Sequence, residues 1–479
     1  MSVDENSQLL ISNAKAGRMR VLGEGVSLEG DNFWAPENMS SGSPMLRPIR
    51  DPEDGDYIRF DVQSAGGIMP RLDPELAAIV EDLYKDGLND EESPSYGRRF
   101  LTRAVNFVGS ANLPLAERTI ESAARIAMLG GVPQMTKLVS DAVQSAVTQR
   151  LSLGVPDAGM TERRVGPGED IGTSGSGGSP GTSDMAASPA DRGDGFGRDG
   201  LAIWLMPVYQ SQSAWGMKAG NFRMDRHGAL GGLALGADWT WAGAFRAGLN
   251  FGLGGGHLDA GGELAGTTND FSFWGVGLYG GFKSGGFGLA GDLSYTGTYN
   301  KVRQELPGLM DMEDLRSDIR GWAISTGLRA ECRFETDVLD LIPHVGARYM
   351  RLVTESYDAA SGGHGVLDGD AIRQDIWTFP IGMTLSGKVG TESGLVVKPS
   401  LDLSVIPAAG DVDAKSTVRF AGCPRRADLE AGMMDRVTFQ GIVGVEVGNE
   451  TVKVGVNYAL QASSHTTAHG VFGTIRWEF

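Results

Sequence analysis

Apolar residues alternate with small or polar residues along the second half of the chain. Between residues 245 and 254, Phe, Ala and Leu occupy one parity while Arg, Gly and Asn occupy the other, and residues 229–241 and 450–462 repeat the pattern. Successive side chains of a β-strand point to opposite faces. The alternation therefore predicts strands with one apolar face and one face of small and polar residues.

We expect twelve strands, at residues 201–211, 229–241, 244–256, 270–283, 286–300, 318–334, 341–357, 374–388, 394–407, 435–448, 450–462 and 470–479. Short turns are expected at 242–243, 284–285, 335–340, 389–393 and 449. Long loops are expected at 217–228, 257–269, 301–317, 358–373, 408–434 and 463–469. An even strand count with short turns on one side and long loops on the other indicates an outer-membrane β-barrel. Both barrel ends then lie on the short-turn, periplasmic side.

The predicted fold class is an all-β membrane barrel, a 12-stranded antiparallel outer-membrane β-barrel with an N-terminal α-helical pore segment. Its apolar face meets lipid, and its small and polar face lines a wet lumen. Aromatic residues near strand ends are expected to form an interfacial girdle: Trp204, Trp239, Trp241, Trp322, Trp377, Trp477 and Phe479. The alternative, a large soluble β-barrel, explains neither the loop rhythm nor the glycine-rich second face.

Two helices are expected before the strands. Residues 115–129 form one, which ends at a pair of glycines, and residues 133–151 form the second, with a proline at its first position. The second helix is ~28 Å long, close to the thickness of a bilayer's hydrocarbon core. It nevertheless carries five polar residues, Lys137, Asp141, Gln144, Gln149 and Arg150. This mixture predicts a helix inside a water-filled pore, and a packing helix of a soluble domain is the alternative.

The pattern divides the chain into four segments. Residues 1–114 form a weakly patterned junction region with a capped helix at 73–87 and short strands near 9–11 and 19–22. Residues 115–152 contain the two helices. Residues 153–200 are rich in Gly, Ser and Pro, which predicts a flexible linker. Residues 201–479 form the barrel.

Composition narrows the function further. The formal charge of −18, without a Lys/Arg block, excludes a nucleic-acid partner. Two cysteines and six scattered histidines lack ligand spacing, so no metal is expected. Cys332 and Cys423 are expected at opposite ends of the barrel, too far apart for a disulfide. Residues 275–280 match G-x-G-x-x-G, but a strand follows instead of a helix, so no cofactor is predicted.

Residues 98–479 resemble the translocator unit of autotransporters, the type V secretion proteins. The segments that carry the resemblance are residues 123–152, 341–349, 397–411 and 470–479. The resemblance implies a monomeric barrel in the Gram-negative outer membrane that delivers an N-terminal passenger to the cell surface without ATP. It also implies a plug helix and contact with outer-membrane lipid and lipopolysaccharide. The barrel assembly machinery is expected to recognise the terminal strand through Ile475, Trp477 and Phe479.

The sequence departs from the family pattern in three places. The linker at 153–200 is longer than usual and is expected to hang in the periplasm. The plug helix has no Asn-Asn pair, so self-cleavage of that kind is not expected. The upstream region is short for a β-helical passenger and starts without a signal peptide, so we expect either the C-terminal part of a longer protein or a product with a misplaced start.

Two other functions remain open at this level. An outer-membrane hydrolase needs a nucleophile near a histidine, and five histidines are candidates: His257, His344, His364, His465 and His469. No G-x-S-x-G motif accompanies them, so no catalytic residue is assigned and the chain is not expected to be an enzyme. A passive porin would not need the plug helix.

Overall fold

The computed structural model describes residues 9–11, 17–20, 39–53, 57–86, 95–152, 196, 199–309, 311–336, 339–391, 395–449 and 451–479. The predicted linker at 153–200 lies almost entirely outside the described residues.

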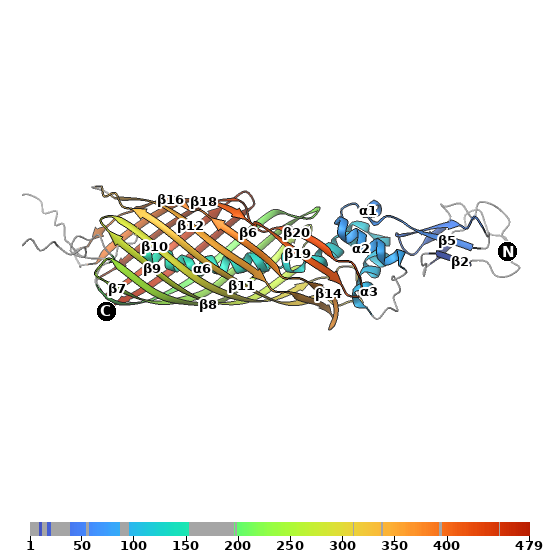
Figure 1. The fold of residues 1–479 in the computed structure, drawn as a ribbon, viewed down its shortest axis with the longest axis horizontal. Helices are drawn as coiled ribbons and strands as arrows, with labels where there is room; N and C mark the ends of the chain where they lie inside the picture. Colours follow the sequence, from blue (N-terminus) through green and yellow to red (C-terminus); the bar gives the residue numbers. More distant parts are fainter. Residues whose placement is uncertain are drawn as a thin grey trace, which may run out of the picture.

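Twelve antiparallel strands close into a barrel, as the alternating pattern predicts (Figure 1). They are β6 Gly200–Ala219, β7 Phe222–Trp241, β8 Phe245–Gly262, β9 Thr267–Ser284, β10 Phe287–Gln304, β11 Leu315–Cys332, β12 Asp340–Thr354, β15 Ile372–Thr378 continued by β16 Ile381–Ser386, β18 Val396–Gly410, β21 Val437–Gly448, β22 Val452–Ala462 and β23 Thr466–Glu478. The barrel closes where β23 pairs with β6. At one end the strands join through short turns. The turn at Ala242 and Gly243 has φ values of 54° and 60°, as a tight β-hairpin turn requires.

The prediction of long irregular loops at the other end was wrong. The stretch 217–228 is mostly strand, because β6 and β7 continue to a turn at Gly220 and Asn221. Two further hairpins fill other predicted loops, β13 Tyr357–Ser361 with β14 His364–Gly369 and β19 Asp413–Phe420 with β20 Ala427–Gly432. These extensions have polar outer faces, so they lack the lipid-facing pattern that identified the other strands. At the short-turn end, β17 Val389–Gly390 adds a brief pairing with β18.

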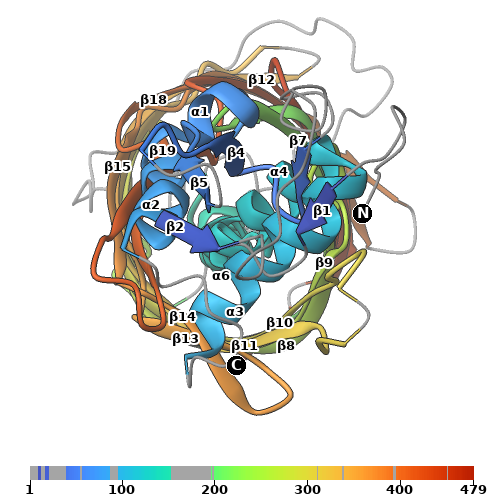
Figure 2. The same ribbon diagram turned by 90° about the vertical axis from the view of Figure 1, so that its right-hand side faces the viewer.

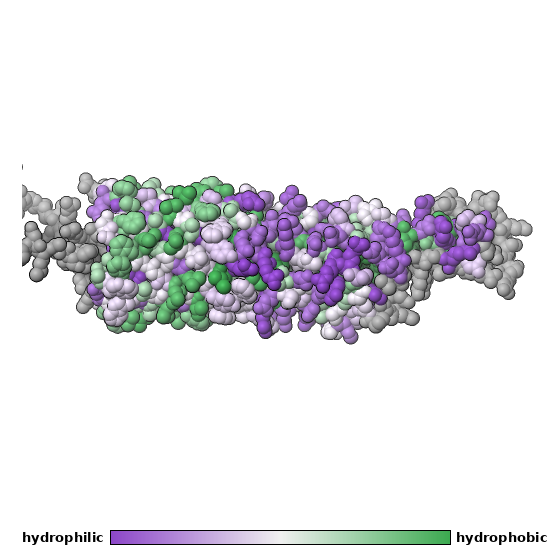
Figure 3. Space-filling view, in the orientation of Figure 1, coloured by the Kyte–Doolittle hydropathy of each residue, from purple (hydrophilic) through white to green (hydrophobic). Residues whose placement is uncertain are grey.

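Large apolar side chains face outward around the barrel, as a lipid-facing surface requires. Figure 3 shows this apolar band over the part of the barrel nearer the short turns, with hydrophilic residues beyond it. Exposed examples include Leu249, Leu278 and Leu328. Trp204 is an exception to the predicted girdle: it is buried in the lumen, where its indole N–H donates to the Tyr279 hydroxyl at 2.8 Å. Its parity along β6 was misread because both faces of that strand carry apolar residues.

The described N-terminal region contains two small sheets and a group of helices. The strands are β1 Leu9–Ile11, β2 Gly17–Arg20, β3 Met39–Ser41, β4 Leu46–Arg50 and β5 Tyr57–Val62. The helices are α1 Ala65–Ile68, α2 Pro74–Lys85, α3 Tyr96–Arg103, the π-helix η3 Ala104–Gly109, α4 Leu113–Ala124, α5 Ile126–Leu129 and α6 Val132–Leu151. The predicted capped helix is α2, where Asp73 accepts from the backbone N–H of Glu75 at 3.0 Å.

The predicted single helix over 115–129 is broken into α4 and α5 at Arg125. The Arg125 side chain is fully buried and pairs with Glu121 on α4 and with Asp73, its Nη2 donating to Asp73 Oδ2 at 2.9 Å. Residue spacing alone cannot reveal this break, because the partner Asp73 lies 52 positions upstream.

We call residues 65–86 and 95–131 the helical cap, because they cover the end of the barrel opposite the short turns (Figures 1 and 2). Cap residues and barrel-mouth residues belong to a single apolar core. In it, Phe100 of α3 stacks on Phe420 of β19 with ring centroids 5.8 Å apart. The strand extensions beyond the lipid-facing band therefore supply the barrel side of the core that the cap packs against.

Candidate functional site

Helix α6 runs through the barrel lumen from the cap to the short-turn end (Figure 2). Gly131, at φ 59°, turns the chain from the cap into the pore. A side chain there would be strained, and its Cβ would lie 2.6 Å from the Leu258 side chain of β8. Among the described residues, no helix is both long and apolar enough to cross a bilayer.

One face of α6 packs against the wall formed by β7, β8 and β9. Met135, Leu138, Val139 and Ala142 contact Leu230, Leu258, Phe271 and Phe273 in one apolar cluster. Further along, Val143 lies against two wall glycines. A Cβ at Gly252 or Gly275 would come within 3.2 or 3.3 Å of the Val143 methyl group. Gly275 belongs to the G-x-G-x-x-G segment, so that glycine allows close helix packing.

The five polar residues predicted on this helix take different partners. Lys137 and Asp141 pair with each other at 2.5 Å. Gln144 donates to Ser140 at 2.8 Å on the same helix, and Gln149 accepts from Asn457 of β22 at 3.1 Å. Only Arg150 forms an ion pair with the barrel wall. The five residues therefore do not act as one group.

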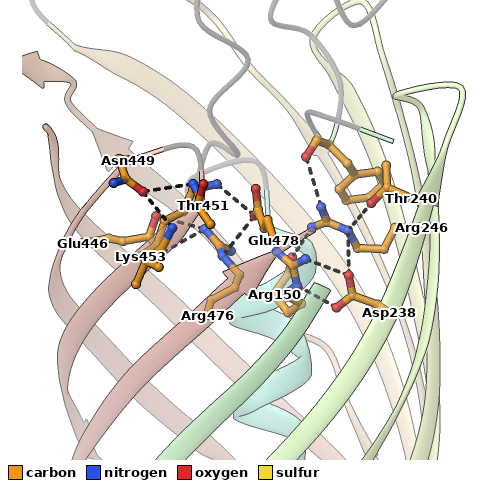
Figure 4. Close-up of polar contacts among 12 residues, drawn as sticks. Arg150, Asp238, Thr240, Arg246, Glu446, Asn449, Thr451, Lys453, Arg476 and Glu478 are labelled. Atoms are coloured by element: carbon orange, nitrogen blue, oxygen red, sulfur yellow. Dashed lines mark hydrogen bonds and ion pairs between the residues drawn. The ribbon is translucent and has the colours of Figure 1, made fainter. Parts of the chain in front are cut away.

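Arg150 anchors the end of α6 to the wall near the short turns (Figure 4). Its Nε and Nη2 both donate to the carboxylate of Asp238 on β7, each at 2.7 Å. Arg246 of β8 lies 3.3 Å from the same carboxylate, and the Tyr279 hydroxyl donates to it at 2.8 Å. A bidentate, fully hydrogen-bonded pair is the strong form of this contact. We call Arg150, Asp238, Arg246 and Tyr279 the Arg150 anchor.

A second ionic group lies on the last strands of the barrel at the same end (Figure 4). Arg476 of β23 donates to both oxygens of Glu446 on β21, at 3.1 and 3.2 Å. Lys453 of β22 donates to Glu478 at 2.9 Å. These pairs link three neighbouring strands on the lumen side, next to the closing seam.

A cavity of about 260 Å³ remains beside α6. Lys137 and Asp141 line it from the helix, and Asp402 lines it from the wall. Arg348 holds Asp292 across the cavity wall with two hydrogen bonds of 2.8 and 2.7 Å. The charges that face this space are therefore largely paired, and the helix leaves one side of the lumen open.

Two clusters of described residues combine His, Asp and Ser as a hydrolase site does. In one, the Asp435 carboxylate meets His465 Nδ1 at 2.8 Å and accepts from the Ser463 hydroxyl at 2.6 Å, so that serine points at the carboxylate. The other consists of His344, Asp402 and Ser404. His344 Nε2 lies 2.8 Å from Asp402, and the Ser404 hydroxyl donates to the same carboxylate at 2.7 Å. The serine oxygen also approaches Nε2, at 3.5 Å. A catalytic triad needs serine and carboxylate on opposite ring nitrogens. Here both meet one nitrogen, so the arrangement links β12 with β18 across β16 and does not activate the serine.

The two cysteines are free and lie at opposite ends of the barrel, as predicted. Cys332 pairs with Phe287 beside a short turn, and Cys423 follows β19 beneath the cap. Burial raises the pKa of the Cys423 thiol to about 11. Among the described residues, no group of three His, Cys, Asp or Glu side chains could hold a metal ion.

Of the three predicted assembly residues, Ile475 and Trp477 lie on β23, the strand that closes the barrel, and Phe479 follows its last residue. Trp477 is 38% exposed and Phe479 is 65% exposed, whereas Ile475 is half-buried. The Phe479 backbone N–H donates to the Leu201 carbonyl at 2.9 Å, next to the first residues of β6.

The sequence did not identify the partners of α6. Asp238 and Arg246 were visible as polar residues on the inward parity of their strands, but nothing marked them as partners of Arg150. The sequence does contain a usable signal, because a charged side chain that points from a strand into the lumen needs an opposite charge nearby. The contacts of the cap with the barrel mouth left no comparable pattern.

An apolar outer surface, short turns at one end and a polar helix within the lumen define an integral outer-membrane β-barrel. The model of the autotransporter β-domain family matches residues 203–459, which is 257 of the 479 residues, and the chain belongs to this family. The protein is therefore a translocator in the Gram-negative outer membrane that carries a passenger.

Solved structures similar to this chain include three from autotransporters. The translocator domain of NalP from Neisseria meningitidis is 13% identical, with a TM-score of 0.46 over 60% of this chain and 92% of that one. The β-domain of BrkA from Bordetella is 16% identical, with a TM-score of 0.44 over 59% and 100%. The transport unit of AIDA-I from Escherichia coli is 17% identical, with a TM-score of 0.46 over 58% and 90%. No curated protein matches the chain.

Proposed function

We propose that α6 is the part of the exported chain that stays in the pore when transport is complete. The observation that carries this proposal is the direction of the helix: it follows the cap, begins at the covered mouth and ends at the Arg150 anchor near the short turns. If the N-terminal segment is exported and the chain returns to the first strand on the periplasmic side, the segment between them must cross the pore in this direction.

In this proposal residues 1–114 are the end of the passenger and its junction, and residues 115–152 supply the linker helices and the plug. Residues 153–200 return to β6 on the periplasmic side. Export uses no ATP. The cap buries its apolar side chains only after it has left the pore, so its folding outside favours forward movement.

Each polar residue of α6 has its own place in the proposal. Arg150 holds the finished plug to the wall through Asp238. Gln149 adds a weaker contact with Asn457. Lys137, Asp141 and Gln144 keep the opposite face of the helix compatible with water in the cavity.

We further propose that the barrel assembly machinery recognises Ile475 and Trp477 of β23 and Phe479, which follows it. The support is their position at the end of the strand that must pair last with β6. Removal of Phe479 is expected to slow assembly without altering the lumen. The barrel is proposed to act as a monomer within lipid and lipopolysaccharide and to catalyse no reaction.

A passive porin is the competing function, and the cavity beside α6 is the observation that favours it. A porin would leave the N-terminal segment in the periplasm. An epitope placed before Met1 therefore separates the two functions on intact cells. We expect antibody to label the epitope without permeabilisation. Labelling that requires a broken outer membrane, in cells with a correctly folded barrel, would contradict export.

A further inference from the structure

Aromatic side chains mark one height on the outer face of the barrel, between the apolar band and the cap. They form two ladders, in which adjacent ring centroids lie 5.0 to 6.4 Å apart: Trp274, Tyr295 and Trp322 on β9, β10 and β11, and Tyr349, Trp377 and Phe379 on β12 and β15. Tryptophan and tyrosine concentrate at the headgroup level of a membrane. These ladders therefore mark the outer-leaflet headgroup level on this side of the barrel.

Four basic side chains stand just beyond the ladders, toward the cap. Lys301, Arg320, Arg351 and Arg373 lie on β10, β11, β12 and β15, and all four are exposed. Each shares its strand face with a ladder residue that lies two to six positions closer to the short turns. At ~3.3 Å per residue, this spacing puts the four charges roughly 7 to 20 Å beyond the rings along the strands. We call these four residues the basic cluster.

The basic cluster is only partly neutralised by its neighbours. Arg351 lies 3.7 Å from Asp375, a carboxylate that also accepts from the Tyr349 hydroxyl at 2.6 Å. The other three cations form no ion pair with any described residue. In the strand register Lys301 faces Asp318 of β11 on one side and Asp270 of β9 on the other, and Glu355 follows β12 beside Arg320.

The cluster is confined to one side of the barrel. The outward faces of β18, β21, β22 and β23 carry no Lys or Arg, because Lys398, Lys453 and Arg476 all point inward and are buried. In a chain with a formal charge of −18, four exposed cations on adjacent strands are a local exception. They stand where the phosphate groups of outer-leaflet lipids would lie.

We propose that the basic cluster binds the phosphorylated headgroup of a glycolipid in the outer leaflet. The guanidinium groups of Arg320, Arg351 and Arg373 can donate two parallel hydrogen bonds to a phosphate, and Lys301 adds a point charge. The aromatic ladders contact the acyl chains and the sugar level below. The proposal depends on the outer-membrane location of the barrel. It specifies which strands and which residues contact the lipid headgroup.

The test compares the full-length protein with Arg320→Gln/Arg373→Gln, in detergent micelles that contain lipopolysaccharide or the same material after phosphatase treatment. Each charge near an anionic headgroup contributes about fivefold in affinity, so we expect the double variant to bind ~25-fold more weakly. The dephosphorylated ligand should bind both proteins equally. Lys218→Gln/Lys415→Gln, which removes two exposed cations outside the cluster, is the matched control.

Three results would overturn the proposal. They are equal affinity of wild type and double variant, an equal loss in the control, or binding that disappears when divalent ions are chelated, which would assign the contact to the carboxylates. Heat-modifiability on gels verifies that every variant folds. Display of the N-terminal epitope is measured in parallel and should not change, so a failure of export and a failure of lipid binding are distinguishable.

Discussion

The two ends of the lumen are closed by different physical means. At the short-turn end, α6 is held by the Arg150 anchor, a buried ion pair with further polar neighbours. At the other end the cap and the barrel mouth share an apolar core, which includes Phe100 and Phe420. Helix α6 makes small apolar contacts with the wall along one face and adds a buried ion pair at its end, whereas the cap buries many apolar side chains in one continuous core. The comparison teaches that the capped mouth depends mainly on apolar burial, whereas the short-turn end also depends on a specific buried ion pair.

The largest expected effect is at the apolar end. Phe100→Ala removes a fully buried ring from the shared core and should destabilise the docked cap by about 3–5 kcal/mol. Phe107→Ala is the matched control, because that ring is 59% exposed. Limited proteolysis of the cap in the folded, purified protein measures the difference. Equal protection of the two variants would show that the core does not hold the cap.

The next effect is at the polar end. Arg150→Ala leaves Asp238 buried with Arg246 and Tyr279 as its remaining partners, so we expect a loss of about 2–3 kcal/mol, below the usual cost of a broken buried pair. Lys137→Ala is the control, because the Lys137–Asp141 pair lies within one helix turn beside the cavity. Its loss should cost about 0.5 kcal/mol or less. Amide hydrogen exchange in α6 reports both, and similar exchange would contradict the anchor.

The smallest effect is a dependence of cap docking on pH. Glu263, in the turn after β8, accepts from the backbone N–H of Arg223 at 2.9 Å and from Arg71 of the cap at 2.7 Å. The backbone hydrogen bond, followed by the one from Arg71, lowers the pKa of Glu263 below its usual value. The hydrogen bond from Arg223 lies within the barrel, so only the lowering caused by Arg71 depends on docking. That part stabilises the docked state above the ordinary glutamate range and is lost as pH falls below it.

Cap protection should therefore weaken as pH falls below the ordinary glutamate range, and Glu263→Gln should flatten that part of the profile. Glu430→Gln, which alters an exposed carboxylate 4.0 Å from Lys415, serves as the control. An unchanged profile in Glu263→Gln would remove this contact from the account.

The membrane part of the fold was predictable because lipid imposes one simple rule on every strand. Period-two alternation and tight turns such as Ala242–Gly243 reveal the lipid-facing strands locally. The helix at 133–151 was recognisable because it is long enough to cross a bilayer but too polar to lie in lipid. The strand extensions under the cap follow no such rule, since their inner faces pack against helices far away in sequence. Trp204 was misjudged because both faces of β6 carry apolar residues, and Asp238 was missed because its partner Arg150 depends on how α6 sits in the lumen.

The most direct test of the account is the ion conductance of three proteins in planar bilayers: the full chain, a variant without residues 1–131, and a variant without residues 1–152. The full chain keeps both the cap and α6, the second protein has lost the cap, and the third has lost the cap and α6. If α6 fills the pore, removal of the cap alone should raise conductance slightly, and removal of α6 should raise it several-fold. Equal conductance of the second and third proteins would contradict the claim that the helix occupies the lumen.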